Sequence, residues 1–482
     1  MDVNLSELLA ALPEDDPSST TNAEWVQERL RDILADLAQR PVPAGSLHRL
    51  WTLSELSAQI ALAYLALWVR RWFADAEVSK RRLMETNLRV SLKIFHRLSY
   101  LRGAMTKLGQ AASNLPRILP EQVAATLDRL HFDAPPMHYP LIREVVRNEF
   151  GKEPEELFLS FEKEAFAAAS LGQVHRARLK SGETVAVKIQ YPGIARTIDA
   201  DFRNLSALLL PLRLGKDWDS VKRQFEEIRR MLNQEVDYLQ EAESLRLARE
   251  LFRPEDGIVV PQSYPEYSSK RVLTTDYIQG LHLPDYLATN PTQASRNAFG
   301  TKVYISWFRM YYAFMTYADP HPGNYLFLSD GRLGLIDFGC VQHYGPEERE
   351  LVRLAEKMAY EDPSIIPEVV GRACGVTADD PQFEDYVRIM KESLDWMMEP
   401  VRQPGAFDFG NETHFQRGLD WFQGVVRSRR TRSHPVYVYW NRSVFGSKAL
   451  LYRLRAQIDL HEVLRQERPK GWTDSTAPRA GG

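Results

Sequence analysis

Two aspartates and one asparagine in a single 24-residue segment constrain this chain most strongly. The segment YADPHPGNYLFLSDGRLGLIDFGC, residues 317–340, places Asn324 five residues after Asp319 and Asp337 thirteen residues after Asn324. Apolar residues around these positions predict strands. Carboxylate and amide oxygens are the ligands that a hard cation such as Mg²⁺ prefers, so the segment predicts a site for chemistry on phosphates.

This spacing is the one that protein-kinase-like folds use for phosphoryl transfer. There the first Asp orients the nucleophile, while the Asn and the Asp of Asp-Phe-Gly hold Mg²⁺ on the nucleotide phosphates. We therefore expect Asp319 to be catalytic, and Asn324 and Asp337 to be metal ligands. An Asp-Phe-Gly alone is a weak signal, whereas the two motifs at the correct spacing are a strong one.

A lysine on a predicted strand is the second candidate. In TVAVKIQ, Val185, Val187 and Ile189 alternate onto one face and leave Ala186 and Lys188 on the other. A lysine at such a place neutralises the α- and β-phosphates of a nucleotide, and a small residue beside it leaves room for adenine. Alone, Lys188 would be interpreted as a solvent-facing lysine on an edge strand; the downstream motifs favour the functional interpretation.

Such a lysine needs a carboxylate on a helix to hold it in place. The segment NQEVDYLQEAE offers Glu235, Asp237, Glu241 and Glu243. On a regular helix Asp237 and Glu241 share a face, whereas Glu235 and Asp237 point almost opposite ways. All four could form a solvated acidic face, and composition alone does not choose among them.

The loop ahead of Lys188 departs from an ordinary kinase phosphate loop, which is rich in glycine. The corresponding stretch, EAFAAASLGQVHRA, contains Ala167, Ala168, Ala169 and Ser170 but only one glycine, Gly172. Alanines restrict the backbone conformations that glycine permits, so we expect the nucleotide to be gripped differently.

A second departure follows the Asp-Phe-Gly. No Ala-Pro-Glu motif is present, and GPEERELVRLAEKM predicts a helix almost at once. In protein kinases the segment between these two motifs forms the platform for a peptide substrate. Its absence argues against conventional protein phosphorylation.

Bulk properties predict an ordinary intracellular protein. The 482 residues carry 61 Lys and Arg against 64 Asp and Glu, a balance that calls for no nucleic-acid partner. Two cysteines, Cys340 and Cys374, are too few for a disulfide framework, and the N-terminus lacks a secretory signal. We therefore expect a cytoplasmic protein. The apolar run from Ile60 to Val69 is too short to cross a bilayer, and Arg70, Arg71, Trp72 and Phe73 follow it. A buried core helix is the first interpretation, and a peripheral membrane-interface helix from Ile60 to Phe73 is the second.

The order of predicted elements indicates an α+β, bilobal protein-kinase-like fold with an N-terminal helical extension. The expected parts are a disordered N-terminus (1–20), a helical extension (21–150), an N-lobe (151–280) with a β-hairpin around KSGE and a long helix over about 220–252, a helical C-lobe (281–465) and a tail (466–482). A helix is also expected over PLIREVVRNEF, with Gly151 at its C-terminal cap.

Together these motifs resemble the UbiB family of AarF-domain atypical kinases. KLGQ (Lys107 to Gln110) matches the family's KxGQ, EVD (Glu235 to Asp237) its ExD, and AAASLGQVH, DPHPGN and DFG its Ala-rich, catalytic and metal segments. The resemblance covers about residues 95 to 345. It implies that the KxGQ helix packs over the active site and occludes the space of a protein substrate.

The resemblance also assigns residues. Glu241 would pair with Lys188, and a regulatory contact would place the KxGQ residues against the ExD acids, which requires an irregular helix there. That contact would involve Lys107, Gly109, Gln110, Glu235 and Asp237, and the nucleotide would contact Ala167, Ala168, Ala169, Ser170, Gly172, Gln173, Ala186 and Lys188. The family's usual residue two positions before the catalytic Asp is His, whereas this chain has Tyr317.

The function that follows is an ATP- and Mg²⁺-dependent atypical kinase or ATPase. The resemblance implies a role in isoprenoid-quinone or related lipid metabolism at a membrane surface, with an isoprenoid lipid, a quinone precursor or a lipid-biosynthesis complex as partner. Two alternatives stay open. One is a small-molecule kinase of the aminoglycoside or choline type, which an acidic pocket in the C-lobe would favour, and the other is a nucleotide-binding scaffold.

Overall fold

A computed structural model describes residues 137–169, 171–192, 233–428 and 433–469, with the isolated residues 194, 226, 229 and 230. By its internal contacts the chain divides into two compact units. The first comprises residues 1–145, 163–175 and 189–233, and the second comprises 146–162, 176–188 and 234–482. No helix among the described residues is long and apolar enough to cross a bilayer.

Part of what the sequence predicts lies outside the described residues. This holds for the disordered segment 1–20, the helical extension as far as residue 136, the run from Ile60 to Phe73, the motif residues Lys107, Gly109 and Gln110, the loop residue Ser170, and the tail from residue 470. These predictions stay predictions.

Among the described residues before the sheet, the longest helix is α7 (Tyr139–Phe150), which is followed by the single turn α8 (Pro154–Leu157). Pro140 lies in the first turn of α7, where a missing N–H removes no helical hydrogen bond. Gly151 follows the last helical residue with φ of +66°, a left-handed conformation that glycine adopts without steric cost. The predicted helix and its glycine cap are confirmed.

One sheet carries Lys188. Its strand order is β1 (Ser160–Phe161), β3 (Gly172–Arg178), β4 (Thr184–Gln190) and β6 (Val272–Asp276), and β2 (Ala167–Ala169) pairs with β3. The short segment 179–183 joins β3 to its neighbour β4, which confirms the predicted hairpin. Val185, Val187 and Ile189 are fully buried, whereas Ala186 and Lys188 on the other face are partly exposed, so the predicted alternation is also confirmed.

The continuous helix predicted over about 220–252 is wrong. Helix α11 spans only Tyr238–Arg249, and the chain leaves helical geometry at Val236 and Asp237. The Asp237 carboxylate accepts hydrogen bonds from the backbone N–H groups of Leu239 at 3.2 Å and Gln240 at 3.4 Å. The first N–H groups of a helix have no intrahelical acceptor, so an aspartate at this place starts a new helix.

After β6 the described chain is mainly helical, as predicted. The helices are α12 (Leu283–Ala288), α13 (Gln293–Tyr312), α14 (Pro346–Tyr360), α15 (Ile366–Cys374), α16 (Phe383–Arg402), α17 (Glu412–Ser428), α18 (Pro435–Leu454) and α19 (Leu460–Glu467). Short strands are β5 (Ile258–Val259), β7 (Met315–Tyr317), β8 (Tyr325–Phe327), β9 (Leu333–Leu335), β10 (Val341–His343), β11 (Phe407–Asp408) and β12 (Gln457–Ile458).

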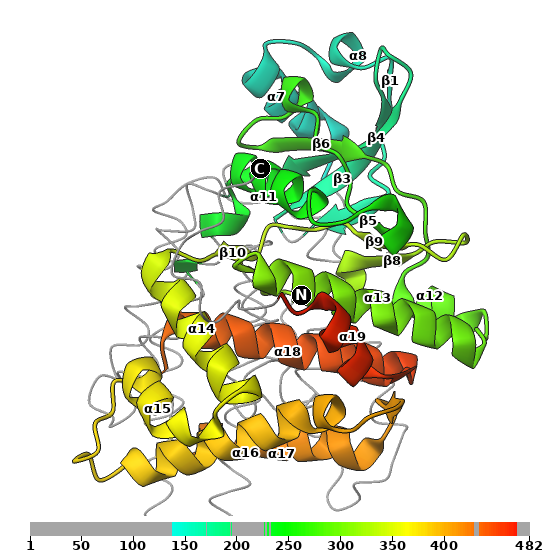
Figure 1. The fold of residues 1–482 in the computed structure, drawn as a ribbon. Coiled ribbons are helices and arrows are strands. Elements are labelled where there is room, and N and C mark those ends of the chain that lie inside the picture. The colour runs from blue at the N-terminus through cyan, green and yellow to red at the C-terminus, as the bar shows by residue number, and fades with distance from the viewer. Residues whose placement is uncertain are drawn as a thin grey trace, which may run out of the picture. The chain divides into compact units, whose positions relative to one another are not determined.

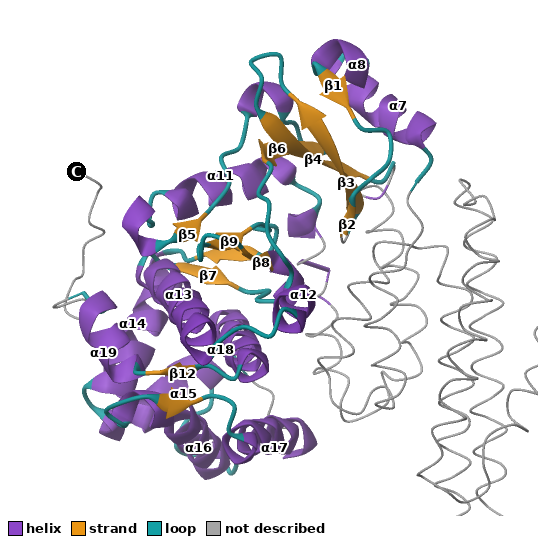
Figure 2. Cartoon of the chain, turned by 90° about the vertical axis from the view of Figure 1, so that its right-hand side faces the viewer, coloured by secondary structure: helices purple, strands orange, loops and turns teal. Residues whose placement is uncertain are grey.

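These short strands position the motif segments. β7 pairs antiparallel with β10, and Tyr317 lies opposite Val341. β8 pairs antiparallel with β9, and β5 runs parallel to β9 (Figure 2). The segment with Asp319 leaves the end of β7 and the Asp-Phe-Gly segment enters β10, so the pairing of β7 with β10 brings the two motifs together.

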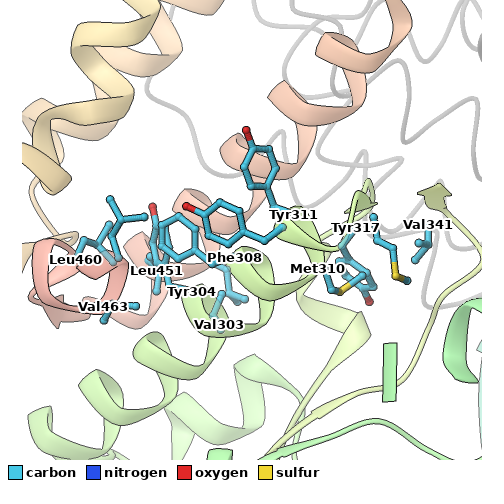
Figure 3. Packing of buried hydrophobic residues seen from close by; sticks show 14 of the residues in the cluster. Val303, Tyr304, Phe308, Met310, Tyr311, Tyr317, Val341, Leu451, Leu460 and Val463 are labelled. Atoms are coloured by element: carbon cyan, nitrogen blue, oxygen red, sulfur yellow. The ribbon is translucent and has the colours of Figure 1, made fainter. Parts of the chain in front are cut away.

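The core of this helical part is built on α13, which is buried on several sides. Figure 3 shows Tyr304, Phe308 and Tyr311 of this helix, with Leu451 of α18 and Leu460 of α19 also within the cluster. Rings four residues apart stack along α13: the centroids of Trp307 and Tyr311 are 5.3 Å apart, and those of Phe308 and Tyr312 are 6.0 Å apart. Aromatic side chains at this spacing bury large apolar areas, so α13 stabilises this part of the fold.

Helix α18 runs between α13 and the pair α16 and α17, and contacts α14 as well (Figure 1). It also approaches the segment with Asp319, because a Cβ atom on Gly446 would lie 2.2 Å from Cγ of Pro320. Real Cβ contacts are not this short, so position 446 requires glycine. The packing of α18 thereby holds the residue that follows Asp319.

We expect Gly446→Ala to lower the free energy of unfolding by about 1–3 kcal/mol, because the added methyl group overpacks this contact. Thermal unfolding of the purified variant measures it. The matched control is Gly424→Ala on α17, where an added Cβ meets no atom within 4 Å. Alanine favours a helix over glycine, so the control should be as stable as the wild type or more stable. Equal stability of Gly446→Ala and Gly424→Ala would contradict the packing argument.

The expected tail begins too early at residue 466. Glu467 pairs with Arg309 of α13 at 2.7 Å, and Arg468 pairs with Glu356 at 2.9 Å and Glu361 at 2.7 Å, both from the α14 region. These ion pairs hold α19 and the residue after it against two other helices. The helical part therefore continues to Arg468.

Candidate functional site

Lys188 lies between two carboxylates from distant parts of the sequence. Its Nζ donates to both oxygens of Glu241, at 2.9 and 3.0 Å, and to Oδ2 of Asp337 at 3.1 Å. The Lys188 ammonium also lies 5.1 Å from the ring centroid of Tyr238. Strand β4 supplies Lys188, helix α11 supplies Glu241 and Tyr238, and the Asp-Phe-Gly segment supplies Asp337. The structure therefore contains the Lys188–Glu241 pair that the family resemblance implied.

Burial gives this cluster its unusual electrostatics. The side chain of Glu241 is 2% exposed and that of Lys188 is 17% exposed. Burial by itself would lower the pKa of Lys188, but the charges of Asp337 and Glu241 raise it well above its ordinary value. Burial raises the pKa of Glu241 to about 7, against the opposing effect of Lys188. Lys188 is thus a permanent cation, whereas Glu241 titrates near neutrality.

The raised pKa of Glu241 predicts a pH-dependent stability. The folded-state pKa of about 7 lies above the ordinary value of 4.5, so Glu241 contributes stability that is full below pH 4.5 and is lost as the pH rises through about 7. Glu241→Gln cannot ionise and should lack this loss. We expect the difference in unfolding free energy between variant and wild type to shift in favour of the variant between pH 5 and pH 8. Denaturant titrations at several pH values measure it, and a difference independent of pH would contradict the assignment.

The Asp-Phe-Gly segment is tied to α11 and the residues before it. The backbone N–H of Phe338 donates to Oε1 of Glu241 at 3.3 Å, and the thiol of Cys340 donates to Glu235 at 2.9 Å. Two further contacts extend the link: the amides of Gln234 and Gln342 bond each other at 2.6 and 3.3 Å, and Ser244 bonds His343 at 2.9 Å. The partner of Lys188 and the expected metal ligand Asp337 are therefore held by one network.

Asp319 and Asn324 form a compact turn. The side-chain amide of Asn324 donates to the backbone oxygen of Asp319 at 2.8 Å, and Nδ1 of His321 accepts from the N–H of Gly323 at 3.0 Å. Residues Pro322–Asn324 make one 3₁₀ turn that leads into β8. Because its nitrogen is engaged, Asn324 keeps its amide oxygen as an acceptor.

The chemistry of Asn324 and Asp337 suits a magnesium ion on nucleotide phosphates, and the metal itself stays a prediction. No group of three or more His, Cys, Asp or Glu side chains within the described residues could hold a metal. Mg²⁺ on a nucleotide needs only one or two protein oxygens, because phosphates and waters complete its shell. The Asn324 oxygen and the Asp337 carboxylate fit this requirement.

Comparison with known protein families identifies the family of this chain. A family model described as ABC1 atypical kinase-like domain matches residues 129–369, half of the chain. The chain belongs to the ABC1 family, the UbiB-type atypical kinase-like proteins. Its α+β, kinase-like fold class is thereby shown.

Individual relatives agree with this family. AarF domain-containing protein kinase 1 of Mus musculus is 32% identical over 60% of this chain and 55% of its own length. The mitochondrial atypical kinase coq-8 of Caenorhabditis elegans is 28% identical over 88% of this chain and 58% of its own length. In the first four relatives the chain spans between 33% and 64% of the relative.

A solved structure is similar over most of the chain. The complex of Rv3197 with erythromycin, from Mycobacterium tuberculosis, has a TM-score of 0.53 and 25% identity, over 83% of this chain and 100% of that one.

In this ABC1-family chain the Ala-rich stretch is a strand, not a loop, as far as it is described. Ala167 to Ala169 form β2, which pairs antiparallel with the start of β3. Gly172 is required there, since a Cβ would lie 2.2 Å from the backbone oxygen of Ile189. The Gln173 side chain is buried and accepts from the N–H of Met137 at 2.7 Å, so its amide lies in the interior. Nucleotide contacts by these residues stay predictions.

The ExD residues have separate partners among the described residues. Glu235 is buried and accepts the thiol hydrogen bond, whereas Asp237 caps α11. The break at 236–237 is the irregularity that the family's regulatory contact would require. The regulatory roles of Glu235 and Asp237 stay predictions, as do the catalytic and metal roles of the other site residues.

Sequence reasoning missed several neighbours of the site. Tyr238, Cys340 and the Gln234–Gln342 pair lie directly beside motif residues, but none is part of a motif. For Gln234, Tyr238 and Cys340, sequence position next to EVD or DFG was the available signal, whereas Gln342 lies three residues after Gly339 and had none. That position did not reveal which atoms these side chains contact.

Proposed function

We propose that this chain is an ATP- and Mg²⁺-dependent atypical kinase or ATPase that supports isoprenoid-quinone or related lipid metabolism. The observation that carries the proposal is the position of Lys188 between Glu241 and Asp337. A lysine held by a helix carboxylate next to the Asp-Phe-Gly aspartate is the arrangement that phosphoryl transfer uses.

Each residue has a distinct part in the proposed chemistry. Asn324 and Asp337 would hold Mg²⁺, which supplies charge neutralisation on the phosphates when bound. The Lys188 ammonium, kept charged by its two carboxylates, binds phosphate oxygens. Asp319 orients the attacking hydroxyl or water and accepts its proton. These groups act by positioning and electrostatics, which dominate phosphoryl transfer.

Conventional protein phosphorylation is not part of the proposal. Between Gly339 and α14 the chain contains only β10 and a short connection, and α14 begins at Pro346. A peptide platform needs a longer segment at this place. A small acceptor or water fits the site better.

A lipid role is proposed from family membership. Relatives are described as mitochondrial atypical kinases in Caenorhabditis elegans and Danio rerio. A cytoplasmic protein with peripheral membrane contact is our proposal for this chain, and the run from Ile60 to Phe73 is the candidate contact. If deletion of that run left liposome binding unchanged, the run would not be the membrane contact.

The testing experiment measures phosphate release from ATP by the purified full chain. It is run with and without liposomes that carry a quinone-precursor mimic, beside the variant Asp319→Asn. Lipid-stimulated release that depends on Asp319, without labelling of protein, supports the proposal. ATP binding without turnover under every condition would instead indicate a nucleotide-binding scaffold.

A groove in the helical part favours a second candidate, a small-molecule kinase. It lies along α16 and α17 and has a volume of about 730 Å³. Four carboxylates, two arginines and the indoles of Trp396 and Trp421 line it. Arg402 pairs with Asp395, Arg417 with Glu399 and Arg388 with Glu392, whereas the described partner of Asp420 is the neutral amide of Gln416. The Asp420 carboxylate beside aromatic rings suits an organic cation.

This candidate is tested with choline and with erythromycin, the ligand named for the solved relative. If the groove binds cations, Asp420→Asn should weaken binding about fivefold, and choline should be phosphorylated in the presence of ATP. Glu368→Gln, an exposed carboxylate of α15, is the control. Equal affinities of both variants, with no labelled choline, would exclude the candidate.

A further inference from the structure

Two buried tyrosines lie beside the Lys188 cluster with unpartnered hydroxyl groups. Tyr238 is 1% exposed and Tyr317 is 6% exposed. Neither hydroxyl has a hydrogen-bond partner among the described residues. Tyr238 begins α11 and Tyr317 ends β7, so the two hydroxyls come from different elements.

Both hydroxyls are within electrostatic reach of the same carboxylates. Burial raises the pKa of Tyr238 above its usual value. The charge of Lys188 opposes this rise, and the carboxylates of Glu241 and Asp337 add to it. Burial first, and then Tyr325, Asp337, Asp319 and Glu241, raise the pKa of Tyr317 well above its usual value. Each tyrosine is therefore an uncharged O–H donor at neutral pH, close to the residues proposed to bind a nucleotide.

Packing explains the rings but not the hydroxyls. The ring of Tyr317 packs edge-to-face on Phe338 of the Asp-Phe-Gly, with centroids 5.5 Å apart, and on Tyr325 at 6.0 Å. Phenylalanine would make the same ring contacts. A buried donor without an acceptor destabilises a fold, so a hydroxyl at such a place is expected to have an acceptor in another state of the protein.

We propose that the Tyr317 hydroxyl donates a hydrogen bond to an oxygen atom of the bound metal–nucleotide complex, and that the Tyr238 hydroxyl does the same from α11. The acceptor is a phosphate oxygen. This inference rests on the proposed function, because it assumes that the Lys188 site binds a nucleotide. It adds two hydroxyl donors to the charged residues of the motifs.

Tyr317→Phe and Tyr238→Phe test the inference, with two readouts for each variant. The first is the melting temperature without nucleotide, which should equal or exceed that of the wild type, because an unpartnered buried polar atom is removed. The second is the dissociation constant for ATP, with Mg²⁺ and with EDTA. We expect binding about tenfold weaker in the presence of Mg²⁺, the usual effect of losing a hydrogen bond to a charged group.

The two binding conditions distinguish a contact that needs the metal from one that does not. Weaker binding with and without Mg²⁺ indicates a phosphate oxygen that the metal does not position, and weaker binding only with Mg²⁺ indicates a phosphate oxygen that the metal holds within reach of the hydroxyl. The control is Tyr437→Phe, whose buried hydroxyl donates to the backbone oxygen of Leu351 at 3.0 Å. It should lower the melting temperature and leave the affinity for ATP unchanged.

Two outcomes would overturn the inference. Unchanged ATP affinity of both site variants would mean that the hydroxyls have no ligand role, while nucleotide binding by the wild type would keep the proposed function intact. A lower melting temperature without nucleotide would mean that the hydroxyls have a structural partner. No ATP binding by the wild type would instead contradict the proposed function itself.

Discussion

Replacing Asp337 with Asn should lower nucleotide turnover by about a thousandfold and leave the protein folded. The substitution keeps the size of the side chain but removes a charge that faces both Lys188 and the expected metal ion. Asp337 accepts from Lys188 at 3.1 Å and from the N–H of Gly339 at 3.0 Å. The remaining Lys188–Glu241 pair should preserve the local structure. Phosphate release from ATP, measured across a range of Mg²⁺ concentrations, checks the expectation.

A matched control separates the site from general surface charge. Asp330 lies in the turn between β8 and β9 and pairs with Arg332, and both side chains are about half exposed. Exposed pairs contribute little to stability, so Asp330→Asn should retain full turnover. If Asp337→Asn were as active as this control, the Asp-Phe-Gly aspartate would not be a metal ligand, and a nucleotide-binding scaffold would be the better interpretation.

Lys188→Met should be the most destabilising change at the site, by about 3–5 kcal/mol near pH 8. It removes the cation between two carboxylates, one of which, Glu241, is 2% exposed and cannot reach water. A buried charge without its partner carries most of its desolvation cost. Chemical denaturation measures the loss. It should be smaller at pH 5, because the pKa of Glu241 is raised to about 7 by burial and the carboxyl is then protonated.

The double variant Lys188→Met with Glu241→Gln distinguishes stability from function. Removing both charges should restore much of the stability, because no uncompensated carboxylate remains on α11. Nucleotide turnover should stay lost, since the ammonium is still missing. Lys357→Met, an exposed lysine of α14, is the control and should change neither property. Recovery of turnover in the double variant would contradict the role of Lys188.

Local sequence patterns predicted much of the fold. Alternation in TVAVKIQ predicted strand β4 and its buried face, and Pro140 with Gly151 marked the ends of α7. These signals succeed because side-chain period and backbone preference act over a few residues. The prediction of one helix over 220–252 was wrong because it relied on the same local signal. Helical periodicity continues across EVD, but Asp237 satisfies the next N–H groups with its own side chain and starts a new helix.

Spacing identified the site residues without placing them. The separations of Asp319, Asn324 and Asp337 predicted a phosphoryl-transfer centre. That chemistry needs an Asp and an Asn on the catalytic loop and a second Asp in the Asp-Phe-Gly segment. Among the four acids from Glu235 to Glu243, however, the residues alone left the partner of Lys188 open. The structure selects Glu241, which lies 2.9 Å from the ammonium.

The sequence by itself therefore determined the chemical groups, their order along the chain and the kinase-like family. Only the tertiary structure decided which groups meet. Lys188 and Glu241 are separated by 53 residues and Lys188 and Asp337 by 149, and no local rule relates positions so far apart. Their contact depends on how β4, α11 and the strand pair β7–β10 pack. The unpartnered hydroxyls of Tyr238 and Tyr317 emerge only from the same packing, because a tyrosine's partners are not encoded by its neighbours in sequence.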